Sequence, residues 1–307
     1  MVVSQVCNEI TKSREAVYGD ATATTEADWG YIESFSYTEE ETVEQIGTVG
    51  GGATFQRNEP GLYKVTGTLT TKVTKASLPE LLEGFFGGRT DTTDYAISHD
   101  EKTIISYVVQ AQHSRAVGGI GSDQIATISG LVFTTLNIDA AKDGFMIVSC
   151  DFLAQKLVMS AGTISTTLPT ESLYSWLDIS GSYGGTALKA NSYSLNLDWN
   201  VDPNDGRGLE SVSAGSRRLI QRVIKNTLLV SGSIDVKIED ALEFGYEDEK
   251  TDQTLVLTTS RGTDNEHTFT VTGCDLDNKS SEMTAEAGVK NFTADVLGRD
   301  MTAAGDL

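Results

Sequence analysis

The sequence has few of the residues that cross-link a chain or interrupt a strand. Its 307 residues include four prolines and three cysteines, Cys7, Cys150 and Cys274. An odd number of cysteines with no CxxC pair argues against a disulfide framework, a zinc site and a redox motif. We therefore interpret all three as buried or idle thiols.

Long apolar runs are also missing. No stretch approaches the roughly 20 apolar residues that a membrane-spanning helix requires. Residues 1–10 lack both the basic and the apolar region of a signal peptide. These absences predict a soluble protein without a membrane partner that is used without being secreted.

Positive charge is scarce as well. The chain has 23 Lys and Arg against 44 Asp and Glu, which gives a formal net charge of −21. Such a surface repels DNA and anionic membranes, so it disfavours nucleic-acid-binding proteins as a class. Two interpretations of the acidity remain open: adaptation to a salt-rich cytoplasm, where screening is strong, or a face that must not stick to a polyanion.

No catalytic or cofactor-binding motif is present. His99, His113 and His267 have no metal-ligand spacing, and there is no GxSxG, P-loop or strand-linked GxGxxG motif. Alternating oxygen ligands at residues 198–204 resemble a calcium loop, but the glycine and the twelfth-position Glu of that loop are missing. We expect no enzyme activity, no cofactor and no metal; a carboxylate pair among the many acids is the enzymatic alternative.

What the sequence does contain is abundant Ser, Thr and Gly in alternating patterns, which is typical of mainly β domains. One strand pattern, Val-[Ser/Thr]-Gly-[Ser/Thr]-[Leu/Ile], occurs twice. Its apolar and glycine positions, which follow the period of two of a strand, are Val65, Gly67 and Leu69 in the first copy and Val230, Gly232 and Ile234 in the second. A glycine kept in mid-strand suggests close approach of another chain segment.

The neighbours of this pattern repeat in the same order. Alternating strands at 31–37 and 193–199 precede the two copies, and each is followed by a long polar connection. Downstream, a Thr-x-[Ser/Thr]-Gly strand and a closing alternating strand occur in both halves. We interpret the chain as two diverged copies of one β domain. Chance similarity between β-rich segments is the alternative.

The repeat divides the chain into five parts. We expect an N-terminal arm at 1–28, a first β domain at 29–158, a linker at 159–172, a second β domain at 173–299 and a C-terminal tail at 300–307. Each domain is predicted to be a β-sandwich or open barrel with a short flanking helix. With 39% hydrophobic residues, the chain can hold two packed cores.

A helix is predicted after the first Gly-centred strand. Ser77 and Glu80 form a capping-box pattern, the apolar residues of 78–86 share one helical face, and Gly87 ends it. Its counterpart in the second half, residues 240–245, is only about one turn long.

Both halves carry a long connection between their first two strands, at 39–60 and 201–226. Connections of this length are usually functional or disordered. The first is acidic and contains a glycine run, whereas the second holds the basic cluster of the chain. The candidate contact residues are Glu39, Glu40, Glu41, Gly50, Gly51, Gly52, Arg217, Arg218 and Arg222. Because the two sets have opposite charge, we expect them to meet between copies of the chain; a solvated helical turn is the alternative for the basic cluster.

The series of strand, long connection, Y-x-V-x-G-x-L strand, short helix and closing strands, present twice, resembles the major tail tube protein of long-tailed viruses. The resemblance covers residues 29–299. It implies a β-sandwich with a flanking helix, whose copies join their sheets side by side into rings that stack into a tube. Most members of that family have one domain and form hexamers, so a duplicated form is expected to close as a homotrimer, a pseudo-hexamer.

The resemblance further implies a virion structural protein of the tail, assembled in the host cytoplasm, with the tape measure and tail terminator proteins as partners. DNA would pass through the lumen during ejection without specific binding, and the long connections would contact the next ring. The acidity resembles that of proteins from salt-loving archaea, which suggests a haloarchaeal host. The short second helix and the shorter middle of the second half depart from the pattern.

A rival interpretation is a two-domain adhesin or carbohydrate-binding protein, or a capsid decoration protein. An adhesin would favour a signal peptide and an aromatic binding strip, whereas Trp29, Trp176 and Trp199 are scattered along the chain. A tail terminator or baseplate hub would share the sandwich fold, so these roles also remain open.

Overall fold

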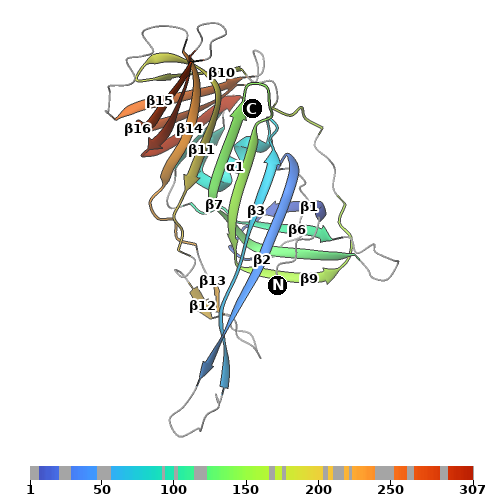
Figure 1. The fold of residues 1–307 in the computed structure, drawn as a ribbon. Helices are drawn as coiled ribbons and strands as arrows, with labels where there is room; N and C mark the ends of the chain where they lie inside the picture. Colours follow the sequence, from blue (N-terminus) through green and yellow to red (C-terminus); the bar gives the residue numbers. More distant parts are fainter. Residues whose placement is uncertain are drawn as a thin grey trace.

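The computed structural model describes residues 7–20, 29–46, 57–91, 94–99, 103–113, 123–165, 170–174, 178–202, 207–209, 218–220, 223–238, 252–260, 266–283 and 290–306. In this part of the chain the structure is mainly β, as predicted, with one helix, α1 (Ser77–Phe86) (Figure 1). The strands of the first half are β1 (Cys7–Arg14), β2 (Tyr31–Ile46), β3 (Arg57–Lys72), β4 (Gly87–Asp91), β5 (Asp94–His99), β6 (Tyr107–His113), β7 (Gln124–Ala141), β8 (Ile147–Ala154) and β9 (Lys156–Ala161). Those of the second half are β10 (Asp178–Tyr183), β11 (Thr186–Asp198), β12 (Arg207–Leu209), β13 (Arg218–Ile220), β14 (Leu229–Ile238), β15 (Gln253–Ser260), β16 (Glu266–Met283), β17 (Lys290–Gly298) and β18 (Asp300–Asp306). Among the described residues, no helix has the length and apolar character needed to cross a membrane.

Eight strands form one continuous sheet that crosses both halves. Their order is β2–β3–β8–β7–β11–β14–β17–β16, and every neighbouring pair is antiparallel. The pair that joins the halves is β7–β11, in which Ile138 lies opposite Leu195. The halves are therefore connected by a backbone ladder as well as by side-chain packing.

The strand pairings of the first half recur in the second. β1 and β10 pair with β6 and β15, which pair with β7 and β16, which pair in turn with β9 and β18. Likewise β2 and β11 pair with β3 and β14, which pair with β8 and β17. Within the described residues, α1, β4 and β5 occur in the first half alone, and β12 and β13 in the second alone.

The second half closes into a barrel. Six strands, β10–β11–β14–β17–β16–β15, pair around a full circle. The β10–β11 hairpin completes this circle and turns at Gly184 and Gly185, whose positive φ angles of 56° and 84° suit glycine. In the first half, no β1–β2 pairing exists among the described residues, so the corresponding circle is open there.

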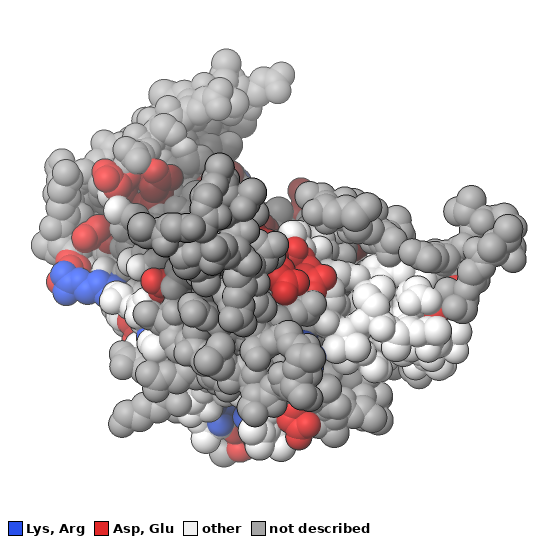
Figure 2. Space-filling view, turned by 90° about the horizontal axis from the view of Figure 1, so that it is seen from below, with Lys and Arg blue, Asp and Glu red and all other residues white. Residues whose placement is uncertain are grey.

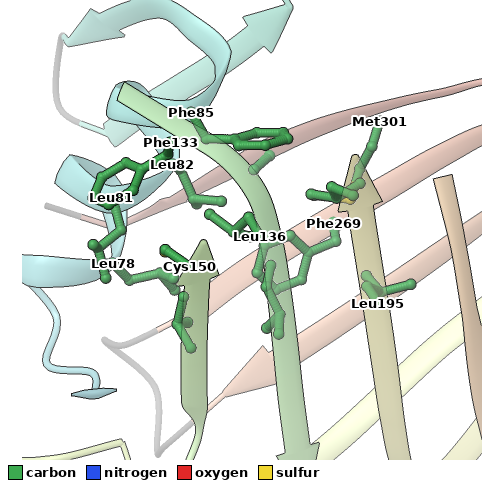
Figure 3. Packing of buried hydrophobic residues seen from close by; sticks show 14 of the residues in the cluster. Leu78, Leu81, Leu82, Phe85, Phe133, Leu136, Cys150, Leu195, Phe269 and Met301 are labelled. Atoms are coloured by element: carbon green, nitrogen blue, oxygen red, sulfur yellow. The ribbon is translucent and has the colours of Figure 1, made fainter. Parts of the chain in front are cut away.

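The hydrophobic core is continuous between the halves (Figure 3). It contains Leu78, Leu81, Leu82 and Phe85 of α1, Phe133 and Leu136 of β7, Cys150 of β8, Leu195 of β11, Phe269 of β16 and Met301 of β18. Trp199, which follows β11, donates a hydrogen bond from Nε1 to the carbonyl oxygen of Phe85 at 2.9 Å. The second half thus satisfies a carbonyl group at the end of α1 that the helix itself leaves unpaired. One main core is thus shared by both halves, and a smaller separate cluster contains Val132, Leu153, Ile220 and Val223.

The predicted helix forms, but its predicted capping box is wrong. Ala76 is the N-cap and makes no side-chain capping bond. Ser77 lies inside the helix, and its Oγ accepts a hydrogen bond from the backbone N–H of Thr74 at 2.8 Å. Glu80 instead accepts a hydrogen bond from Lys12 of β1 at 2.5 Å. Gly87 ends the helix with a φ of 91°, as predicted; the second predicted helix, at 240–245, lies outside the described residues.

Three segments expected to be an arm, a linker and a tail contain strands. β1 lies within 1–28, the predicted linker at 159–172 begins inside β9, and the predicted tail at 300–307 forms β18. β18 pairs with β16 on one side and with β5 of the first half on the other. Its alternating residues Met301 and Ala303 are buried, so burial of one face holds this strand against the core.

The first long connection is largely a hairpin rather than the expected loop. β2 and β3 continue their pairing as far as Ile46 opposite Arg57 and form an arm that extends from the body (Figure 1). The ladder continues because it satisfies the backbone N–H and C=O groups of both strands. Gly50, Gly51 and Gly52 lie outside the described residues.

Candidate assembly surface

The eight-stranded sheet has one apolar and one polar face. In β3, Val65 and Leu69 are buried in the core, whereas Thr66, Thr68 and Thr70 alternate with them and are partly exposed. The hydroxyl, amide and carboxylate residues on this second side, here called the polar face, are Ser36, Thr38, Thr66, Thr68, Thr70, Ser149, Asp151, Thr135, Asn137, Asp139, Ser194, Asn196, Asp198, Ser231, Ser233, Asp235, Thr293, Asp295 and Asp277. The sequence motifs did not identify this face. The pattern in the sequence that could have revealed it is the alternation of polar with apolar residues, as in residues 194–198.

The carboxylates near the centre of the polar face are held by neutral donors. Asp151 accepts hydrogen bonds from the hydroxyl groups of Thr68 at 2.6 Å and Thr135 at 2.8 Å. Asp139 accepts one from the side-chain amide of Asn137 at 2.8 Å. Neutral donors orient a carboxylate without cancelling its charge, so these positions remain negative.

Lysines occur toward the ends of the polar face. Lys64 forms an ion pair with Glu40 at 2.9 Å, and Lys72 forms one with Glu33 at 2.6 Å, both between β3 and β2. Such exposed pairs add little stability, but they offset the positive charge of β3. On the side of the molecule that Figure 2 presents, the described residues likewise include more acidic than basic side chains.

An open hollow of about 520 Å³ lies on the polar face, lined mainly by residues of the first half and also by Asp198, Asn200 and Val201 of the second. Ser36, Thr66, Thr135, Asp151 and Asp198 contribute to its lining. This described lining offers hydroxyl and carboxylate oxygens but no histidine, cysteine or lysine. It therefore lacks the paired nucleophile and base that most acyl-transfer sites require.

Two edges of the sheet have a single strand neighbour within the described residues. β2 pairs with β3 alone. The first part of β16 lies between β15 and β18, but from Asp275 to Met283 its pairings run to β17 alone. A strand edge of this kind presents backbone N–H and C=O groups to an incoming strand.

The predicted acidic contact residues lie on the arm. Glu39, Glu40 and Glu41 of β2 are exposed where the β2–β3 hairpin leaves the body. Glu40 is already paired with Lys64 of its own chain. An ion pair with another copy is therefore not needed to neutralise that carboxylate.

Arg218 of the basic cluster lies beside the hairpin of its own chain. β12 and β13 pair with each other, and Arg218 lies opposite Leu62 in a parallel pairing of β13 with β3. The alternative of a helical turn is wrong for 218–220, because Leu219 and Ile220 are buried as part of a strand. Arg217 and Arg222 lie outside the described residues, so the expected contact with a second copy stays a prediction.

The repeated glycines occupy matching close contacts. A Cβ added to Gly67 would lie 2.1 Å from the carbonyl oxygen of Ser36, and one added to Gly232 would lie 2.1 Å from that of Ser194. Their strand neighbours in the repeat, Val65 and Leu69 in β3 and Val230 and Ile234 in β14, are buried. The mid-strand glycines thus permit the close approach that the sequence pattern suggested.

The histidines serve packing contacts within the described residues. Tyr95 of β5 and His267 of β16 are joined by a 2.6 Å hydrogen bond, and burial lowers the pKa of His267 to about 3. His113 is 2.7 Å from the hydroxyl of Tyr37, and burial lowers its pKa as well. His99 lies 3.6 Å from Asp300.

Two of the cysteines are buried free thiols, as predicted. Burial raises the pKa of both Cys150 and Cys274, the latter to about 12. A thiol that stays protonated is a poor nucleophile and a poor metal ligand.

The calcium-like pattern forms a local turn. Asp198 accepts a hydrogen bond from the backbone N–H of Asn200 at 2.7 Å, and Asn200 has a φ of 46°. Asn204 lies outside the described residues. In the part of the chain that is described, no group of three or more His, Cys, Asp or Glu side chains is placed to hold a metal ion.

Comparison with known proteins agrees with this architecture. A profile of the phage tail tube protein family matches residues 10–304, which include all eight strands of the continuous sheet. No curated protein matches the sequence significantly. The matched family consists of structural tail proteins rather than enzymes. Because the match spans both halves, the chain belongs to the phage tail tube protein family.

Proposed function

We propose that copies of this chain self-assemble into rings that stack into a viral tail tube, the conduit for ejection of the viral DNA. The continuous eight-stranded sheet carries the proposal, because one side is buried and the other is lined by hydroxyl and carboxylate groups. Curving such sheets into a closed ring removes their edges and gives a wall with a single polar lining.

The polar face suits the lumen of this conduit. Proteins bind DNA largely by releasing counterions from phosphates with Lys and Arg, and the centre of the polar face offers carboxylates instead. DNA would therefore meet repulsion and slide. The carboxylates proposed to face the lumen are Asp139, Asp151, Asp198, Asp235, Asp277 and Asp295.

We infer further that the two halves are diverged tandem copies of one domain. Each half supplies four strands to the sheet in the same order, which supports this inference. The pairings favour copies at 7–161 and 178–306, because β1 and β9 pair with strands of the first segment and β18 pairs with β16 of the second. Three chains would provide six equivalent positions, so we propose a homotrimeric, pseudo-hexameric ring.

The β2–β3 arm is proposed to contact the next ring, with β12 and β13 beside it. The tape measure and tail terminator proteins, assembly in the host cytoplasm and location in the virion tail are proposed from the family. The net charge of −21 supports a halophilic host.

Two tryptophans bear on the adhesin alternative. Trp29 and Trp199 are 1% and 0% exposed, so they belong to the core and cannot form an aromatic binding strip. Trp176 lies outside the described residues. No specific observation favours the adhesin as a second function.

Negative-stain electron microscopy of the purified chain at low and high salt tests the proposal. We expect rings or hollow tubes of constant lumen, with end views of three-fold symmetry that approaches six-fold. Analytical ultracentrifugation of the same samples gives the mass of the ring. A monodisperse monomer at every salt and protein concentration would contradict the proposed function.

The lumen assignment has its own test. Asp151 and Asp295 are equivalent positions on β8 and β17, and replacing both with Lys places positive charge on the polar face of each half. We expect tubes of D151K/D295K to retain DNA at low salt and release it as salt rises, whereas wild-type tubes do not retain it. D143K/D178K makes the same charge change at exposed sites outside the polar face and serves as the control. Equal DNA retention by both variants would contradict the assignment.

A further inference from the structure

We propose that β2 of one chain pairs antiparallel with β16 of a second chain in one defined register, with Thr38 opposite Ser280 and Ser36 opposite Glu282. The inference rests on the proposed ring and adds the contact that joins one copy to the next. Its template is the β7–β11 junction inside the chain, where Asn137 lies opposite Asn196.

The internal junction joins the last strand of one half to the first strand of the other. β7 ends the first half of the sheet, and β11 begins the second. At the outer ends of the same sheet lie β2, the equivalent of β11, and β16, the equivalent of β7. Each has one neighbour there among the described strands. A second chain can therefore repeat the internal junction at these edges.

The repeated glycines align β2 with β11. The carbonyl oxygens of Ser36 and Ser194 approach Gly67 and Gly232 in the same way. The registers agree, because each serine precedes the residue opposite its glycine. Ser36 and Ser194 are therefore equivalent positions.

The closing strands align β7 with β16. Phe152 of β8 faces Gly67, and Val296 of β17 faces Gly232, so Phe152 and Val296 are equivalent positions. Three residues earlier in each strand, Ser149 corresponds to Thr293. Ser149 faces Asn137 of β7, and Thr293 faces Ser280 of β16. Asn137 and Ser280 are therefore equivalent positions.

Transferring the internal register to the outer edges fixes the contact between chains. Asn137 faces Asn196, whose equivalent is Thr38, so Ser280 faces Thr38 of the next chain. Lys279, the residue before Ser280, lies in the irregular part of β16 between Asp277 and Ser280, and this register brings that part beside Glu39, a residue of opposite charge. Glu39 is one of the acidic contact residues that the sequence suggested.

The two junctions differ on the core side of the sheet. The internal junction places Ile138 opposite Leu195, both fully buried. The register between chains places Ser281 opposite Tyr37 at the same step. A permanent junction can be apolar, whereas an edge that is exposed before assembly needs polar residues to prevent unspecific aggregation.

A second exposed edge points to the same neighbour. In the second half, β18 is covered by β5 of the first half. Its equivalent β9 pairs with β7 alone among the described strands, and Val158 and Met159 of β9 are 46% and 48% exposed. Repeating the internal arrangement places the second half of the neighbouring chain beside this apolar edge, although no counterpart of β5 lies among the described strands of that half.

Disulfide trapping in the full-length chain tests the register. Residues directly opposite in an antiparallel pair have Cα atoms about 4.5–5.5 Å apart, within disulfide reach, whereas diagonal neighbours are about 7–8 Å apart. All variants carry Cys7→Ser, and the buried Cys150 and Cys274 remain. We expect T38C/S280C, after mild oxidation, to run as covalent dimers and trimers that a reductant converts to monomers.

Three matched variants complete the test. S36C/E282C shares the register and must cross-link too, whereas the diagonal T38C/E282C must give several-fold less product. N137C/N196C places the same pair at the internal junction and must stay monomeric after oxidation.

The outcomes separate the register from the proposed function. Suppose that rings are seen in the microscope but T38C/S280C and S36C/E282C do not cross-link, or T38C/E282C cross-links more strongly than they do. Either result overturns the register and leaves the proposed tail-tube function standing. The absence of rings in the wild-type chain overturns the proposed function itself.

Discussion

The two halves keep the same strand pairings but close differently. In the second half, the β10–β11 hairpin completes a six-stranded barrel. In the first half, β1 is instead attached to α1, because Lys12 and Arg14 form ion pairs with Glu80 and Glu83 at 2.5 and 2.8 Å. The order of strands in the main sheet is thus shared, whereas the contacts that β1 and β10 make beside that sheet differ between the halves. The part that is shared is the part proposed to form the tube wall.

The largest effect is expected from removing the apolar contact that α1 makes between the halves. Phe85 is fully buried, and its ring lies 5.6 Å from that of Trp199 of the second half. Phe85→Ala should lower the free energy of unfolding by about 3–5 kcal/mol, because it leaves a cavity in the shared core. Urea unfolding followed by tryptophan fluorescence measures this change.

Leu229→Ala is the control for that experiment. Leu229 is 51% exposed, so its loss should change the free energy of unfolding by less than about 0.5 kcal/mol. Equal effects of the two substitutions would show that α1 does not support both halves.

The repeated glycines allow a direct comparison of the halves. Gly67→Ala and Gly232→Ala each place a Cβ 2.1 Å from a backbone oxygen, so each should cost about 1–3 kcal/mol of stability. Gly144→Ala, whose Cβ would find its nearest neighbour at 3.6 Å, is the matched control. Thermal unfolding of the three variants checks the prediction, and a large difference between the two strand glycines would argue against their equivalence.

His267 adds a pH-dependent contribution to stability that the first half lacks at this position, because the equivalent residue in β7 is Gln124. Burial lowers its pKa in the folded chain to about 3, below the ordinary value of 6.5. Between these values the unfolded chain binds a proton that the folded chain does not, so stability falls as the pH falls through this window. The contribution of His267 reaches at most about 1.4 kcal/mol per pH unit.

His267→Gln, which introduces the residue of the first half, should remove that contribution. We expect the free energy of unfolding to vary less with pH between pH 4 and 6 than in the wild type, with little difference in this dependence above pH 7. Urea titrations at several pH values measure both slopes. Parallel pH profiles for the two proteins would exclude His267 as the titrating group.

The smallest effect is expected at the proposed contact between chains. Glu39→Lys should raise the protein concentration needed for ring assembly by about two- to fivefold, since an exposed ion pair contributes about 0.2–1 kcal/mol. Glu39→Lys combined with Lys279→Glu should restore assembly, and high salt should reduce both effects. Light scattering against concentration measures them; a double variant that is worse than the single one would place these residues apart.

The sequence predicted elements better than their partners. Both Gly-centred strands and the helix after Ser77 are where the patterns placed them, because period, glycine and apolar spacing act over short distances. The arm at β2–β3 was predicted as a loop, and β18 as a tail, since their order comes from partners distant in the sequence. Of the candidate contact residues, the exposed position of Glu39–Glu41 is described by the structure, whereas the polar face emerged only when eight strands were aligned.

The sequence by itself determined that this chain is mainly β, built from repeated strands with a regular apolar side and a surplus of acid. Only the tertiary structure decided that β7 pairs with β11, that β5 reaches β18, and that the polar residues of both halves share one face. The physical reason is that side-chain alternation is a property of a single strand, whereas the backbone edge of that strand accepts any partner in reach. The choice of partner depends on which edges the finished core brings together.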